Sequence, residues 1–321
     1  MKYLSLASTV ILFVVVTGNQ CSQQQVAGDP NDCTPSRTVD QSRGACDVTL
    51  AFTEEFSEDS IGDTLVISSN NIPEHRVGLF GHVSGALNPN AITEQASVYH
   101  IPLHPQKAAM LTPLLSTTGV FPNAGPQYVF GILLNGVELD PIAAEPFPHH
   151  GVTDPNANWE WNLEALNVNL GLDCNNAHVQ PSGKYHYHGT PSLFLEDMHI
   201  HDDEMTLVGY AADGFPVYYA HAYADPYDST SEIIEMTSSY RLKEGERPGD
   251  GITSPCGTYD GVYSNDYEYV PGLGTLDEAN GREGVTPEYP DGTYYYVITD
   301  DFPSIPRYLR GTPSQDFRIG M

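Results

Sequence analysis

The 321-residue chain lacks the short motifs that mark the common catalytic sites. It has no Gly-x-Ser-x-Gly elbow, no His-Glu-x-x-His, no P-loop, no Gly-x-Gly-x-x-Gly and no EF-hand loop. Cys-x-x-Cys is absent as well, which argues against a thiolate zinc site and against a dithiol redox motif. Histidines and carboxylates must therefore carry any chemistry of this protein.

Basic residues and long apolar runs are also scarce. Lys and Arg number 13 against 42 Asp and Glu, and the net charge is −29. Such a charge repels nucleic acid and anionic membranes, so neither is an expected partner. Beyond the N-terminal region no stretch approaches the roughly 20 apolar residues that a membrane span needs.

The N-terminus has the pattern of an export signal. Lys2 is followed by an apolar run over residues 4–16, which is too short to span a bilayer. We expect residues 1–20 to be a signal peptide, residues 21–45 a polar linker, and residues 46–321 one folded domain of a secreted or periplasmic protein. A lipid anchor at Cys21 is the less favoured alternative, because the preceding residue is a large glutamine.

Four cysteines remain when Cys21 is set aside: Cys33, Cys46, Cys174 and Cys256. In an oxidising compartment this number predicts two disulfides. Cys33–Cys46 would close a local loop, and Cys174–Cys256 would join two distant segments. Three connectivities are possible, and the sequence does not choose among them.

Short alternating runs between turn residues predict a mainly β protein. The chain has 29 Gly and 25 Pro, and helical periodicity is hard to find. We expect a single β-rich domain with long loops and little helix, built as a sandwich or an irregular barrel. Hairpins are predicted at residues 128–139, around Asn-Gly, and at 206–219. Further strands are expected at residues 48–52, 65–68, 96–101 and 294–299, and residues 159–166 fit a strand or one helical turn.

Residues 176–191 contain the densest group of histidines, in the order N-A-H-V-Q-P-S-G-K-Y-H-Y-H-G-T-P. Residues 181–183, Pro-Ser-Gly, predict a three-residue hairpin loop in which Gly183 takes the left-handed conformation. A loop centred on Ser182 pairs residue 178 with 186 and residue 176 with 188. This register keeps the histidines and the tyrosines on opposite faces.

The predicted hairpin therefore brings His178, His186 and His188 to one face, because side chains alternate along a strand. Opposed residues have Cβ atoms about 5 Å apart, so one ion is within reach of all three rings. Three imidazoles are the ligand set of a metal site with an open coordination position, and zinc and copper both suit imidazole.

Three further features are weaker candidates. Asn176, opposite His188, and Asp213, in the turn of the second predicted hairpin, are candidates to orient an imidazole. Asp213 could equally serve only to hydrogen-bond its own turn. His199 and His201 could form an accessory metal site, although the acidic residues around them favour a solvated loop.

Residues 183–189, Gly-Lys-Tyr-His-Tyr-His-Gly, resemble the signature of the YHYH-domain family, which is named for this tetrapeptide. The similarity extends from about residue 78 to the C-terminal region and includes residues 177–181, 205–216 and 284–290. The resemblance implies an extracellular bacterial-type domain with a metal site, and it implies no particular reaction.

Three functions remain open. The first is a secreted metal-binding protein, with or without catalysis, in which zinc would favour hydrolysis and copper oxidation. The second is a non-catalytic module for a glycan or peptide, with Trp159 and Trp161 on one strand face; exposed indoles would favour it and buried ones would not. The third is a structural role in which the imidazoles hydrogen-bond to carboxylates. The partner is an unknown extracellular small molecule or polymer, and the oligomeric state stays undetermined.

Overall fold

The computed structural model describes residues 37–319. The predicted signal peptide over residues 1–20, the possible lipid anchor at Cys21, and Cys33 lie outside the described residues. Among the described residues, no helix is long and apolar enough to cross a membrane.

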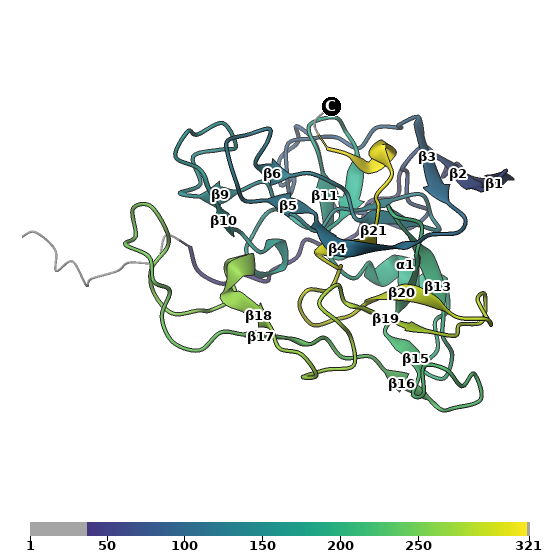
Figure 1. Ribbon diagram of the computed structural model, residues 1–321. Coiled ribbons are helices and arrows are strands. Elements are labelled where there is room, and N and C mark those ends of the chain that lie inside the picture. Colours follow the sequence, from purple (N-terminus) through teal and green to yellow (C-terminus); the bar gives the residue numbers. More distant parts are fainter. Residues whose placement is uncertain (1–36, 320–321) are drawn as a thin grey trace, which may run out of the picture. The chain divides into compact units, whose positions relative to one another are not determined.

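An eight-stranded mixed sheet, in the order β11-β12-β8-β7-β13-β14-β20-β19, is the largest element of the fold. Its β20 and β19 lie side by side in Figure 1. β12 runs parallel to β8, β14 runs parallel to β20, and the remaining neighbours are antiparallel. The strands are β7 Gly131–Leu133, β8 Glu138–Leu139, β11 Ala177–Val179, β12 Tyr185–Tyr187, β13 Leu207–Ala211, β14 Pro216–Tyr219, β19 Gly281–Gly284 and β20 Thr293–Ile298.

Smaller antiparallel sheets account for the other strands. One has three strands, β1 Phe56–Ile61, β2 Thr64–Ser69 and β3 Ser97–Pro102. The two-stranded ones pair β4 Lys107–Pro113 with β21 Tyr308–Gly311, β5 Leu115–Ser116 with β6 Gly125–Pro126, β9 Pro146–Phe147 with β10 Asn158–Asn162, β15 His221–Tyr223 with β16 Ile233–Glu235, and β17 Tyr240–Leu242 with β18 Tyr267–Tyr269. The helices are α1 Ser192–Asp197 and the 3-10 turns η1 Ala165–Asn167, η2 Ser264–Asp266 and η3 Gln315–Phe317.

The prediction of a β-rich domain with little helix is confirmed. The large sheet of the described region is open, so the barrel alternative is wrong. Its strands share one hydrophobic core with the three-stranded sheet. The three-stranded sheet contributes side chains such as Ile67 and Ile101, and the large sheet contributes side chains such as Ile132 and Val217. The core forms because alternation gives each of these strands an apolar face.

Most predicted strands lie near their predicted positions. Asn135-Gly136 joins β7 to β8, with Gly136 in the left-handed region at φ +75°, and the second predicted hairpin is β13–β14. Residues 159–166 become most of β10 followed by η1. Residues 48–52 are an exception, because only Val48 finds a partner, in a single bridge to Val77. An alternating run becomes a strand only where a neighbouring backbone can pair along it.

The described disulfide joins Cys46 to Cys174, 128 residues apart in sequence. Both pairings considered from the sequence, Cys33–Cys46 and Cys174–Cys256, are therefore wrong; Cys256 is disulfide-bonded as well. A bridge between Gly44 and Asp173 brings the two segments side by side, which sequence distance could not reveal.

The packed part of the chain starts a few residues before the predicted boundary at Cys46. The amide of Asp40 donates to the Asn167 carbonyl at 2.9 Å, and Nε of Arg43 donates to Oδ1 of Asn176 at 2.6 Å. The end of the segment predicted as a linker is thus hydrogen-bonded to the base of the histidine hairpin.

Candidate metal centre

The histidine hairpin has the predicted register. β11 and β12 place His178 opposite His186, with Ala177 opposite Tyr187 and Val179 opposite Tyr185. Its turn is closed by the Gln180 amide, which donates to the Lys184 carbonyl at 2.9 Å. Gly183 has φ +86°, and a Cβ there would lie 2.0 Å from Oγ1 of Thr93. Only glycine meets both the conformation and the close packing.

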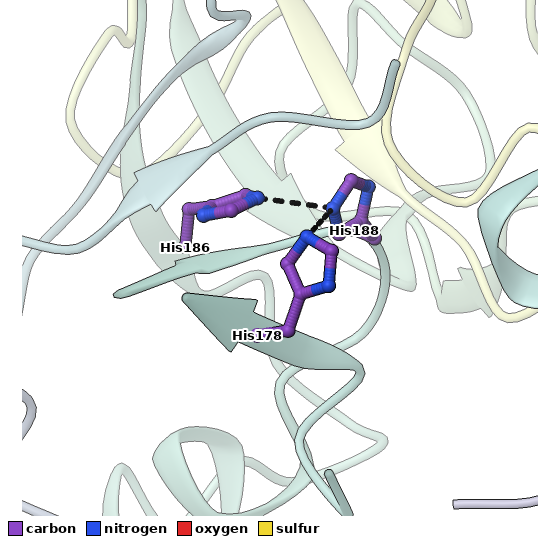
Figure 2. A group of neighbouring side chains, drawn as sticks. All are labelled: His178, His186 and His188. Atoms are coloured by element: carbon purple, nitrogen blue, oxygen red, sulfur yellow. Dashed lines mark hydrogen bonds between the residues drawn. The ribbon is translucent and has the colours of Figure 1, made fainter. Parts of the chain in front are cut away.

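Figure 2 shows the three imidazole rings pointing toward one another. Nε2 of His188 lies 3.0 Å from Nε2 of His186 and 3.1 Å from Nε2 of His178. All three ligand atoms lie within 4.8 Å of one another, and the rings meet edge to face. Nitrogen ligands at about 2.0 Å from a tetrahedral ion are about 3.3 Å apart, so the arrangement is close to what such an ion needs.

Hydrogen bonds among the three rings cannot account for all of these short nitrogen–nitrogen distances. Each neutral imidazole Nε2 carries one proton or one lone pair, so Nε2 of His188 cannot make a full bond to both neighbours. Nδ1 of His178 lies 3.0 Å from the Leu170 carbonyl, which places the proton on Nδ1 and leaves the Nε2 lone pair directed at the other rings. A cation among the three nitrogens would accept all the lone pairs.

Burial keeps the three rings neutral. It lowers the pKa of His178, against the opposing effect of the Leu170 carbonyl. Burial, followed by the charge of neighbouring rings, holds the pKa values of His186 and His188 well below the ordinary value; the Pro141 carbonyl opposes the shift at His188. Both rings are only 2% exposed. Neutral imidazole is the form that binds a metal.

Two carboxylates that sequence reasoning missed lie next to these histidines, one on β8 and one directly after it. β8 runs parallel to β12 and places Glu138 beside His186, so the two side chains share a face. Glu138 accepts from the Lys184 ammonium at 2.7 Å and from the Tyr99 hydroxyl at 2.6 Å. The alternation of Glu138, Leu139 and Asp140 in the sequence indicates that the two carboxylates share one face of a strand. It does not indicate that this strand pairs with the histidine hairpin.

Asp140 is the second of these carboxylates. Its amide donates to the Tyr187 carbonyl at 2.8 Å, and its Oδ2 accepts from Gln180 at 3.1 Å. Oδ1 is buried without a hydrogen bond. Burial, then the charge of Glu138, raises the pKa of Asp140 to about 7. A carboxyl that exchanges its proton near neutral pH therefore lies beside the histidine hairpin.

The opposite face of the hairpin is fixed in the core. The Tyr185 hydroxyl donates to Oδ2 of Asp173 at 2.8 Å, and the Tyr187 hydroxyl lies 2.6 Å from Nε2 of His75. Both tyrosines are fully buried. The two tyrosines of the tetrapeptide thus anchor the strand in the core, and the two histidines reach the candidate site.

The predicted supporting residues have other partners in the structure. Asn176, at φ +54°, accepts from Arg43 and donates to the Thr190 carbonyl at 2.9 Å, so it fixes the base of the hairpin. Asp213 accepts from the Tyr296 hydroxyl at 2.6 Å and the Gly311 amide at 2.7 Å, and more weakly from its own turn at Phe215. A backbone carbonyl, that of Leu170, orients an imidazole instead.

Two other sequence candidates lie outside this centre. His199 and His201 are exposed in the loop after α1. Within residues 37–319, the central histidines form the only group of three or more ligand side chains close enough to hold one ion. Trp159 and Trp161 are 1% and 5% exposed, so both indoles belong to the core.

Comparison with known proteins gives one match. A family model described as "YHYH protein" matches residues 98–311, a segment that runs from β3 to the end of β21 and contains the three histidines. No curated protein and no solved structure matches the chain significantly.

Proposed function

The chain belongs to the YHYH protein family, and we propose that it is a metal-binding protein in which His178, His186 and His188 hold one transition-metal ion. The observation that carries this proposal is the meeting of three neutral Nε2 atoms, two pairs of them 3.0 and 3.1 Å apart. Zinc and copper are the expected metals, because both bind imidazole well.

The residues present fit such an ion. Three uncharged nitrogen donors come from one rigid hairpin, and the Leu170 carbonyl fixes the tautomer of His178. An ion with three protein ligands has a further coordination position, where it can polarise a substrate or lower the pKa of a water molecule. Asp140 is the carboxyl that we propose as general base, since its backbone is hydrogen-bonded to the histidine hairpin at Tyr187 and its Oδ1 is without a hydrogen bond.

The metal would decide the reaction. Zinc would support hydrolysis of an extracellular ester or phosphoester, and copper would support oxidation. The Cys46–Cys174 disulfide fits an oxidising location outside the cytosol, in agreement with the predicted export of the chain.

The two competing functions have less support. A glycan module built on Trp159 and Trp161 lacks its binding surface, because both indoles are buried. A purely structural role predicts carboxylates hydrogen-bonded to the three central rings. Their hydrogen-bond partners in the structure are backbone carbonyls and one another.

Elemental analysis tests the proposal. The purified protein is stripped with a chelator, reconstituted with zinc or copper and desalted, beside a His186→Ala/His188→Ala variant. A His199→Ala/His201→Ala variant is the matched control, because it removes two exposed histidines from the same protein. We expect about one equivalent of metal in the wild type and the control, and none in the site variant. Absence of metal from the wild type, or its loss from the control alone, would contradict the proposal.

A further inference from the structure

A cavity of about 460 Å³ lies outside the histidine centre, since none of the three histidines lines it. Its walls come from the β4–β5 region, β10, β17, the η2–β18 region and residues 302–308. The volume falls in the range of roughly 300–1,000 Å³ that is typical of small-molecule sites. We call it the aromatic cavity.

Four aromatic residues give the aromatic cavity its character: Tyr240, Tyr267, Phe302 and Tyr308. The rings of Tyr267 and Phe302 are stacked, with centroids 3.9 Å apart and planes 7° from parallel, and Tyr240 meets Phe302 edge to face at 5.5 Å. All four are half-buried, so the rings are held in place while part of each remains accessible. The Arg307 guanidinium lies over the Phe302 ring, 5.4 Å from its centroid, so the rings are fixed, and the accessible parts of the four side chains offer aromatic surface to a ligand.

The polar groups of the cavity are hydroxyls and amides. Thr117, Ser264, Asn162 and Asn265 line it beside the aromatic rings. Oδ1 of Asn162 is buried without a hydrogen bond, and so is Nε of Arg307, another lining residue. Both atoms are inaccessible to solvent, so the hydroxyls and amides at the cavity surface are the groups that a ligand can reach.

The charge of the cavity excludes a strongly ionic ligand. Nη2 of Arg307 donates to both carboxylate oxygens of the buried Glu164, at 2.9 and 3.0 Å, so the charge of Arg307 is balanced within the protein. Glu160 is the other charged lining residue, and it is exposed to solvent. An anion would meet no free positive charge there, and the protein carries a net charge of −29.

We propose that the aromatic cavity binds a neutral carbohydrate of the size of a mono- or disaccharide. The C–H groups on the face of a sugar ring carry partial positive charge and pack on an aromatic face, while its hydroxyls match amide and hydroxyl partners. This ligand uses the aromatic rings and the uncharged polar groups together. The binding does not require a metal at the histidines.

Arg307 connects the aromatic cavity to the histidine centre. It donates a hydrogen bond to the carbonyl of Pro141, which follows Asp140 directly, and Ile142 on the other side of Pro141 lines the cavity. A sugar chain that occupies the cavity would therefore be bound in the neighbourhood of the metal centre.

Titration calorimetry on the full folded protein tests this inference, with cellobiose, maltose and N,N′-diacetylchitobiose as probes and digalacturonic acid as the anionic comparison. Tyr267→Ala removes one ring of the stack, and Tyr227→Ala removes an exposed tyrosine that does not line the cavity. Because Tyr267→Ala could disturb packing, Thr117→Trp blocks the cavity by adding bulk at an exposed position. Val120→Trp is its control, on a nearby exposed residue that does not line the cavity.

We expect saturable binding of at least one neutral disaccharide. Tyr267→Ala and Thr117→Trp should each weaken it at least about tenfold, a change of about 1.4 kcal/mol, while both controls stay within about twofold. The His186→Ala/His188→Ala variant should bind the sugar like the wild type, which separates this inference from the metal proposal. Lack of binding by all three neutral probes, tighter binding of the acidic one, or equal loss in the controls would overturn it.

Discussion

At the scale of residues, the centre depends on where each imidazole keeps its proton. The Leu170 carbonyl holds the proton of His178 on the far side of the ring, and burial makes protonation of all three rings costly. Neither effect is visible in the sequence, because both depend on which backbone lies beside the hairpin. The sequence shows the ligand set, and the fold makes those ligands neutral.

This protonation chemistry predicts a pH dependence for the metal-free protein. The folded-state pKa values of the central histidines lie below the unfolded value of about 6.5, so the unfolded state takes up more protons as pH falls through that value. Stability is therefore present above about pH 6.5 and is lost below it. A His178→Gln/His188→Gln variant, which cannot be protonated at those rings, should lose less stability between pH 7 and pH 5.

Thermal unfolding of both chelated proteins across this range is the measurement. Asp140 acts in the opposite direction, because its raised pKa favours the folded state at low pH and that contribution fades as pH rises from about 4 to about 7. The comparison between wild type and variant cancels this background. An equal or steeper loss of stability in the variant would contradict the account.

At the scale of elements, alternation and one turn suffice to predict the histidine hairpin. A loop centred on Ser182 is the register that separates histidines from tyrosines, and the structure has that register. The neighbour of this hairpin could not be predicted in the same way. β8 pairs with β12 in parallel although His186 and its partner Glu138 are 48 positions apart, and nothing in either short run specifies the other. Glu138 and Asp140 were missed for this reason.

Within this hairpin, we expect a substitution of Gly183 to have the largest effect on stability. Alanine there must adopt a positive φ and must also displace Thr93, whose Oγ1 would lie 2.0 Å from the new Cβ. We expect Gly183→Ala to lower stability by about 2–4 kcal/mol and to weaken zinc binding by distorting the hairpin.

Gly62→Ala is the matched control for this change. Gly62 also has a positive φ, at +62°, in the turn between β1 and β2, but a Cβ there meets nothing within 4 Å. It should cost only the backbone strain of about 1–2 kcal/mol and leave zinc affinity unchanged. Chemical denaturation and a competitive zinc titration provide the two measurements; equal effects of both alanines would show that the Thr93 contact is unimportant.

At the scale of the whole molecule, β content was predictable and connectivity was not. The many glycines, prolines and short alternating runs indicate a β-rich chain, which the structure confirms. Long-range pairing decides how the strands combine into an open sheet and which cysteines meet. Cys46 reaches Cys174 through the contact of Gly44 with Asp173, and the sequence contains no signal for that contact.

The Cys46–Cys174 disulfide should stabilise the molecule as a whole. It closes a loop of 128 residues, and the loss of such a link costs about 2–4 kcal/mol, largely by freeing the unfolded chain. A Cys46→Ser/Cys174→Ser variant should therefore unfold at lower denaturant concentration than the wild type. Its zinc stoichiometry should stay the same in the folded state, because neither cysteine belongs to the histidine centre. An unchanged midpoint would contradict the stabilising role.

The metal centre itself is tested most directly by anomalous diffraction from crystals of the protein reconstituted with zinc or with copper, recorded at the absorption edge of each metal. The account predicts one anomalous peak about 2.0–2.1 Å from Nε2 of His178, His186 and His188, with the three nitrogens moved slightly apart to admit it. Crystals that contain the metal but show no peak at these nitrogens, with the rings still about 3 Å from one another, would contradict it.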